Sequence, residues 1–384
     1  MVYRRWLSGW LALAAATLAA TAFAQAPTLP SGPGVPSSRL SGDWRSSARV
    51  TIGSAVPALR PGAATLGSSS ADTRLDRMLL LLEPSSAQKQ ALDAELANQQ
   101  NPASPHFHQW LTPSQFAETY TNSATDVAAV VLWLESEGFV VAPLPAGRSW
   151  IEFSGTVAQV ERAFQTRVES LPLPSGVRPV LVAPVSVPAA LRPVIHGLVS
   201  LDGTVAEPAV TTWNPVARPA AELRTAASLA DSEAVTPQLA AQALHLDAVH
   251  RSGITGVGET IALAARSNIQ ERDVAAFRKA FGLPESALRV LPNGADPGRT
   301  SDEAVALMSA SWAGAAAPGA QIILVPAATT NATDGLDLSL AAIVDQSLAH
   351  TVAVGFSACE ASLSEARQAF YAAVYRQAAA EGIA

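Results

Sequence analysis

Apolar residues after Thr73 are spaced for helices and short strands in mixed order. Leu92 and Leu96 lie four residues apart, which places them on one face of a helix. Thr112 and Pro113 are the residue types that cap a helix N-terminus and fill its first turn. The pattern predicts helices over residues 87–98, 114–120, 124–137 and 157–164, and strands over 139–143 and 150–154.

A different pattern begins at Pro237. The continuous apolar run from Thr260 to Ala265 is typical of a strand buried on both faces. Such runs alternate with helical stretches, which indicates a parallel sheet covered by helices. Ile383 and Ala384 have the pattern of a further strand beginning. Strands are predicted over 260–265, 288–291, 321–326 and 351–356, and helices over 239–249, 271–281, 304–316, 338–347 and 364–380.

Proline, glycine and small residues divide the chain into segments. Residues 25–72 are predicted to be a flexible segment, and the proline-rich residues 172–235 a linker. The mixed pattern over 73–171 predicts a small α+β domain, and 236–384 holds the parallel pattern. We therefore expect two folded domains.

The N-terminus has the three parts of a secretory signal peptide. Arg4 and Arg5 are the positive region, an alanine-rich apolar stretch follows, and Ala22-Phe23-Ala24 is a small-x-small cleavage site. We predict cleavage after Ala24 and a mature protein that is secreted or periplasmic, with no membrane association after cleavage.

Charge and composition narrow the classes of function. The net charge is -7 with no basic block, which argues against a nucleic-acid partner. His106 and His108 lie close together without a third ligand nearby, so we expect two loop histidines and no metal site. The single cysteine, Cys359, excludes an intramolecular disulfide, and we expect it to be a small buried residue.

Two long segments resemble a known family. HQWLTPSQF, within residues 96–120, and the sequence that follows it resemble the activation prodomain of the sedolisin (kumamolisin-like) serine-carboxyl peptidases. Three further segments resemble the start of the peptidase domain: residues 235–284, the sequence WAGAAAPGAQIILV, and the CEASL beginning at Cys359. The resemblance implies an α/β protein: a small α+β activation prodomain followed by the N-terminal part of a subtilisin-like parallel α/β peptidase domain. Protein or peptide substrates are implied, and so is contact between the prodomain and the partial peptidase domain.

The resemblance also implies a catalytic helix over 304–316. In the family, a Glu acts as base to a Ser nucleophile, an Asp four residues later supports the Glu, and a second Asp stabilises the oxyanion. A carboxylate base still works at a pH where His would be protonated. With WAGAAAPGA as the anchor, the Glu position falls on Val305 and the Asp position on Ser309. No catalytic residue is therefore expected to be intact.

Two nearby acids are weaker catalytic candidates. Glu303 lies two residues before Val305, a rotation of about 200° that turns it away from that face. Asp302 and Glu303 also have a sufficient structural role, because acids are favoured at a helix N-terminus. The Gly-Thr-Ser and Gly-Asp-Ser-Gly motifs of the family do not occur in the chain. No cofactor is expected here, and the calcium site implied for the complete family domain would lie beyond the matched segments.

Three interpretations stay open, and with them whether the chain is an enzyme. The first is an exported endopeptidase precursor that is inactive at Val305 and Ser309. The second is a prodomain-like inhibitor or folding partner of a complete sedolisin. The third is a gene fragment, motivated by the last residue, Ala384. Asn331-Ala-Thr333 also fits a glycosylation acceptor.

Overall fold

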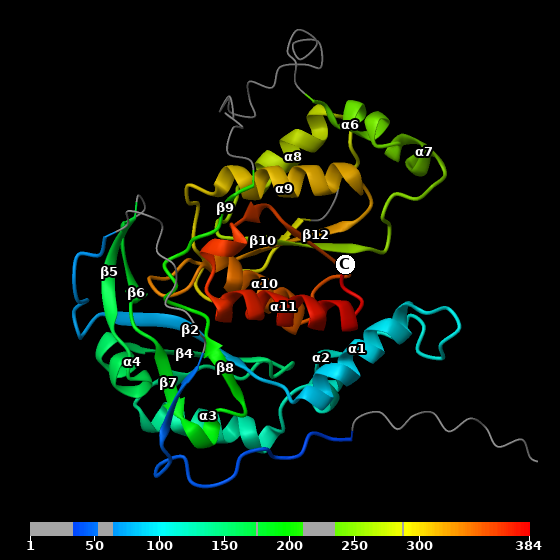
Figure 1. The fold of residues 1–384 in the computed structure, drawn as a ribbon. Helices are drawn as coiled ribbons and strands as arrows, with labels where there is room; N and C mark the ends of the chain where they lie inside the picture. The colour runs from blue at the N-terminus through cyan, green and yellow to red at the C-terminus, as the bar shows by residue number, and fades with distance from the viewer. Residues whose placement is uncertain (1–33, 53–63, 174–175, 210–234, 286–287) are drawn as a thin grey trace, which may run out of the picture. The chain divides into compact units, whose positions relative to one another are not determined.

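The structure is a computed structural model that describes residues 34–52, 64–173, 176–209, 235–285 and 288–384. The expected signal peptide, residues 1–24, lies outside these residues. We call residues 34–209 the N-terminal part and residues 235–384 the C-terminal part. Figure 1 shows both as mixtures of helices and sheets.

A four-stranded antiparallel sheet forms the centre of the N-terminal part. Its strand order is β3 (Val140–Val141), β4 (Trp150–Thr156), β2 (Arg74–Leu82) and β8 (Ile195–Leu198). Residues of β2 alternate between two cores. Leu80 lies in the core of the N-terminal part, and Leu79 lies in a core shared with the C-terminal part. The strand is therefore buried on both faces, as its apolar composition requires.

Four helices of the N-terminal part were predicted from the sequence and are present. They are α1 (Ser86–Gln100), α2 (Pro113–Tyr120), α3 (Ala124–Ser136) and α4 (Val157–Phe164). Three of them begin with reciprocal capping boxes, in which Ser85, Thr112 and Thr156 each pair with a glutamine three residues later. Trp133 of α3 packs edge-on against Phe164 of α4, with ring centroids 5.3 Å apart.

The first part of the expected linker is folded. Residues 172–173 and 176–209 contribute to the antiparallel pair of β5 (Val168–Leu173) and β6 (Gly176–Leu181), and then form β7 (Val185–Pro188), β8 and β9 (Glu207–Pro208). The many prolines are accommodated because β5–β6 is a two-stranded sheet, and edge strands tolerate a missing N–H. Likewise, β1 (Arg49–Ile52) of the expected flexible segment pairs with β7. Residues 210–234 lie outside the described residues.

The C-terminal part contains the predicted parallel sheet. Its strand order is β11 (Leu288–Val290), β12 (Gln321–Pro326), β10 (Thr260–Ala265) and β13 (Thr351–Val354). Leu263 of β10 packs toward the helices α8 (Glu271–Ala280) and α9 (Glu303–Ala316), whereas Ala262 packs toward α10 (Gly335–Asp345). Figure 1 shows these two helical layers on opposite sides of β10 and β12, and α6 (Pro237–Ala243) and α7 (Leu246–Arg251) near α8 and α9.

The two parts share an apolar core. Leu79, Trp150 and Val199 of the N-terminal part pack against α10 and α11 (Glu365–Ala380). Trp150 meets Phe370 of α11 in a T-shaped contact, with ring centroids 5.6 Å apart. A fold that mixes a small α+β unit with a partial parallel α/β unit is thus confirmed.

Hydrogen bonds hold Ala384 beside β13 and the loop before α10 beside β2. Ala384 N–H donates to His350 O and Val352 N–H donates to Ala384 O, at 2.9 and 2.8 Å, which is the pattern of a parallel bridge beside β13. The amide of Asn331 donates to Arg74 O. The hydroxyl of Thr333, which is 2% exposed, donates to Arg77 O at 2.7 Å.

Candidate functional site

Helix α9 lies against the parallel sheet through small residues. Ala306 and Ala310 are buried with Leu263, Ile322 and Leu324 of the sheet. Gly314 lies on the same buried side, beside the guanidinium of Arg278, which donates to Gly314 O at 3.1 Å. Small side chains let the helix approach the sheet closely, which explains the alanine-rich sequence of this segment.

Val305 and Ser309 share the face of α9 that lies over the end of β13. A Cβ atom built on Gly355 would come within 3.0 Å of both Val305 Cγ1 and Ser309 Oγ. The two side chains therefore lie side by side, one helical turn apart, at the carboxyl end of a parallel strand. In doubly wound sheets this edge is where ligands bind.

Asp302 and Glu303 point to other partners. Asp302 forms an ion pair with Arg266, at 3.0 Å between Oδ2 and Nε. Glu303 forms an exposed i,i+4 pair with Arg299, at 3.5 Å. The structure therefore brings together Val305 and Ser309 and ties the two acids into separate ion pairs.

A segment from the N-terminal part lies on the strand that follows Gly355. Strand β9 pairs antiparallel with β14 (Phe356–Ser357), and Ala209 N–H donates to Gly355 O at 3.0 Å. An extended peptide thus runs beside the residues that Val305 and Ser309 face. Its main-chain pairing is of the kind by which sheets receive peptides.

A buried ion cluster lies behind this segment. Arg266 contacts Asp334 at 3.3 Å, donates to Ala206 O at 2.8 Å, and stacks over the ring of Phe356 at 4.4 Å. Arg367 contacts Asp202, Asp334 and Asp337. The cluster joins both parts of the chain, because Asp202 follows β8 whereas Asp334 and Asp337 begin α10.

The pKa values of the cluster differ with the balance of burial and charge. Burial raises the pKa of Asp337 to about 6, although the charge of Arg367 opposes this. Burial also raises the pKa of Asp202. For Asp334 burial acts in the same direction, but Arg266 and Arg367 hold its pKa below the usual value. Asp334 is thus the carboxylate that both guanidiniums stabilise.

Sequence reasoning missed the charged residues of this cluster. Arg266 directly follows the apolar run of β10, and a charge in that place was the available signal. Arg367 lies inside a helix with ordinary polar spacing, so the sequence contained no signal for its role.

The remaining sequence candidates have local roles. His106 contacts Glu95 at 2.8 Å, and His108 stacks between Phe107 and Trp110. Cys359 is exposed, so the expectation of a buried cysteine is wrong. It precedes a short 3-10 turn over Glu360–Ser362 at the surface. Among the described residues, no group of His, Cys, Asp and Glu could hold a metal ion.

Comparisons with known proteins agree with the two-part fold. Residues 61–204 match the family described as pro-kumamolisin, activation domain. The chain is 27% identical to kumamolisin of Bacillus sp. (strain MN-32) over 242 residues, 59% of this chain and 41% of that protein. It is 31% identical to xanthomonalisin of Xanthomonas sp. (strain T-22) over 111 residues, 29% of this chain and 13% of that protein. The chain spans less than half the length of these relatives.

Proposed function

The chain belongs to the sedolisin-family peptidase precursors, with a pro-kumamolisin activation domain at residues 61–204, and from this premise we propose that it is an exported member without peptidase activity. One observation carries the proposal. The side chains of α9 that face Gly355 are Val305 and Ser309, and neither can act as a carboxylate base.

The neighbouring acids do not replace them. Asp302 is paired with Arg266 and Glu303 with Arg299, so both carboxylates already have cationic partners. A general base needs hydrogen-bond reach to the group that it deprotonates. The residues around Gly355 therefore support peptide contact without proton transfer.

An acid peptidase assay tests this proposal. The purified chain is incubated with denatured protein substrates between pH 3 and 6, beside a complete sedolisin as positive control. We expect no cleavage above the blank. Cleavage that Glu303→Gln or Asp302→Asn abolishes would overturn the proposal, because it would assign the chemistry to one of these acids.

A second function, inhibition of a complete sedolisin, is favoured by the pairing of β9 with β14. The same segment could pair with the corresponding strand of another peptidase. The test measures inhibition of a complete sedolisin by this chain and by Ala209→Pro, which lacks the N–H donated to Gly355 O. Inhibition by the wild-type chain at micromolar concentration, lost in Ala209→Pro, would support this function. Absence of inhibition by the wild-type chain would exclude it.

Export has its own support and test. The signal-peptide pattern of residues 1–24 supports export. As a separate finding, none of the helices among the described residues has the length and apolarity of a membrane span. We expect the exported protein to begin at Gln25. Mass spectrometry of its N-terminal peptide checks this, and a protein that keeps residues 1–24 would contradict cleavage.

A further inference from the structure

The N-terminal part has a pocket of about 360 Å³ between α2 and the start of α3. We call it the α2–α3 pocket. Every described residue that lines it lies between residues 35 and 148, so its walls belong to the N-terminal part. They come from the chain at Pro36, from α2, from the turn before α3, and from the loop that carries Arg148. The volume is within the roughly 300–1,000 Å³ that is usual for small-molecule pockets.

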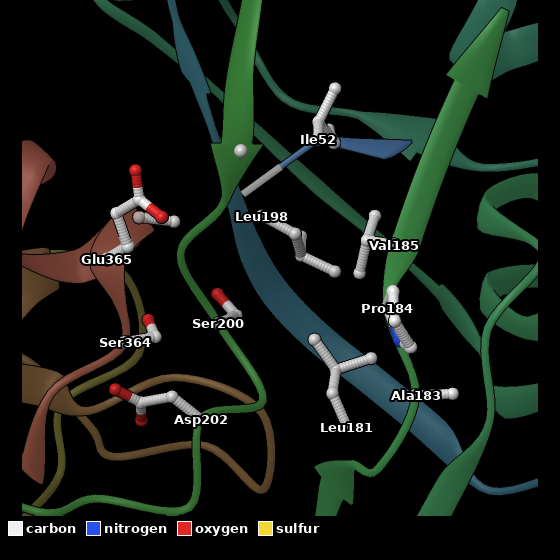
Figure 2. Close-up of a pocket in the computed structure, with 12 residues that line it drawn as sticks. Ile52, Leu181, Ala183, Pro184, Val185, Leu198, Ser200, Asp202, Ser364 and Glu365 are labelled. Atoms are coloured by element: carbon white, nitrogen blue, oxygen red, sulfur yellow. The ribbon is translucent and has the colours of Figure 1, made fainter. Parts of the chain in front are cut away.

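A cavity bounded by β8 and the start of α11 is much smaller. Figure 2 shows Asp202 and Ser364 in its lining, and its volume is about 30 Å³. This space admits about one or two water molecules. The carboxylate of Asp202 already contacts Arg367 at 3.3 Å and accepts a hydrogen bond from Thr204 N–H at 3.0 Å. The α2–α3 pocket is therefore the better candidate for an organic ligand.

Asn122 contributes an unused hydrogen-bond donor to the lining of this pocket. The residue is 1% exposed, and its Nδ2 is buried without a hydrogen-bond partner among the described residues. The other amide atom faces the guanidinium of Arg39. Because a guanidinium only donates, that atom is the carbonyl oxygen Oδ1, and the unpartnered atom is the donor. A buried donor without a partner is costly, so an acceptor at this place would stabilise the site.

Arg148 gives the pocket a positive charge. Its side chain is half-buried, and within the described part of the chain its guanidinium forms neither an ion pair nor a hydrogen bond. The loop around it is held in place, because Ala146 N–H and Gly147 N–H donate to the carboxylate of Asp345 at 3.0 and 2.7 Å. A guanidinium whose donors are all free is well suited to bind a carboxylate group of a ligand.

The start of α3 adds further donors to the lining. The hydroxyl of Ser123 accepts a hydrogen bond from Asp126 N–H at 3.1 Å, and its own proton can still be donated. Ala124 N–H is the first of the helix, so it has no acceptor within the helix, and the helix dipole favours negative charge there. The carboxylate of Asp126 is fully buried and accepts from the Ser38 hydroxyl and from Arg39 N–H at 2.9 Å. Its charge is therefore already compensated.

One acid lines the same pocket from α2. Glu118 is exposed and forms no ion pair with any described residue. Ser114, one helical turn earlier, adds a hydroxyl group to the lining. A simple anion would be attracted by Arg148 and repelled by Glu118. A molecule that carries both a carboxylate and an ammonium group can instead pair with both side chains.

We propose that the α2–α3 pocket binds small zwitterions, in which a free carboxylate and an ammonium group lie a few bonds apart, as in an amino acid or a short peptide with unblocked ends. The carboxylate accepts hydrogen bonds from Arg148, Asn122 and the start of α3, and the ammonium group donates to Glu118. Pro36 and Ala117 supply apolar contact for the rest of the ligand. This site does not depend on whether the chain cleaves peptides.

Isothermal titration calorimetry of the full chain at pH 7 tests the site with two probes, L-alanine and dialanine. We expect saturable one-to-one binding with a Kd of about 1 mM or tighter. Dialanine amide lacks the carboxylate, and N-acetyl dialanine lacks the ammonium group, so each should bind at least about tenfold more weakly than dialanine. Tighter binding of L-alanine than of dialanine would assign free amino acids as the ligand, and the reverse order would assign peptides.

Two variants and one control assign the binding to this pocket. Arg148→Gln should weaken dialanine binding at least about tenfold. Glu118→Gln should remove the difference between dialanine and its N-acetyl form. Arg45→Gln is the matched control, because Arg45 is an exposed arginine of the N-terminal part that lies outside the pocket lining and pairs with Asp43 at 3.6 Å. The control should bind dialanine as the wild type does.

The blocked peptides are measured on the wild-type chain, so the test holds even where a variant fails to fold. Equal binding of dialanine and dialanine amide would overturn the proposal, and so would unchanged binding in a folded Arg148→Gln variant. Absence of saturable binding of both L-alanine and dialanine would overturn it as well, and would leave water as the partner of Asn122.

Discussion

Asp302 at the start of α9 and Arg266 directly after β10 form an ion pair of 3.0 Å, and Arg266 forms a second ion pair with the buried Asp334. The acid that precedes the expected catalytic helix is therefore part of the protein's internal charge balance. Arg266 also lies over the ring of Phe356, which belongs to β14, the strand that pairs with β9 of the N-terminal part. The charge pair and the peptide pairing thus stabilise the same corner of the sheet.

Arg266→Met should lower the free energy of unfolding by about 3–5 kcal/mol. The change leaves Asp334, which is 2% exposed, with Arg367 as its remaining ion-pair partner. Urea denaturation at pH 7 measures the loss. Arg299→Met is the control, because its pair with Glu303 is exposed and should contribute less than about 1 kcal/mol. Equal losses in both variants would contradict a structural role for Arg266.

Phe370→Ala should lower the free energy of unfolding by about 3–5 kcal/mol. Phe370 is fully buried and lies in the core that both parts share, against Trp150. Because that core joins the parts, we expect the described fold to unfold in one transition both before and after the change. Calorimetry measures this, with the exposed Leu132→Ala as control. Two separate transitions in the wild type would show that the parts unfold independently.

Gly355→Ala should destabilise the chain by about 1–3 kcal/mol, because the new methyl group would press on Val305 and Ser309 at 3.0 Å. Val305→Ala opens space at the same place. A double-mutant cycle should therefore show a favourable coupling of at least about 0.5 kcal/mol between the two changes. Additive effects would mean that Val305 does not face Gly355.

Glu83→Gln should make stability less dependent on acid at low pH. Burial would raise the pKa of Glu83, but hydrogen bonds from His196 and Lys89 lower it to about 2. A lowered pKa gives stability that is present above the unfolded value and lost as the pH falls from about 4.5 to 2. The variant should be less stable than wild type at pH 5 and equal to it at pH 2. The exposed Glu118→Gln should change little, and a variant equal to wild type at pH 5 would refute the role of Glu83.

Local signals in the sequence predicted much of the fold. Thr112 and Pro113 marked the start of α2, and the unbroken apolar run of β10 marked a strand buried on both faces. These features depend on neighbours along the chain. The linker expectation failed over residues 172–209, because prolines that exclude a central strand are accepted in two-stranded edges such as β5–β6.

The candidate site was predictable only in part. The spacing within α9 placed Val305 and Ser309 on one face, and the structure locates that face at Gly355. The partners of Arg367 could not be found in this way. Asp202 is separated from Arg367 by 165 positions, and only the packing of the two parts brings them together. Charge balance across a fold is not encoded in local periodicity.

The hydrogen bonds of Asn331 and Thr333 to β2 place the Asn331-Ala-Thr333 sequence where the two parts meet. Once the N-terminal part has docked, the Asn331 amide is engaged with Arg74, and the Thr333 hydroxyl, on a residue that is 2% exposed, with Arg77. An enzyme that must contact the Thr333 hydroxyl would therefore meet it only before docking. In a host that glycosylates Asn-X-Thr sites, modification of Asn331 would mark the chains that docked slowly.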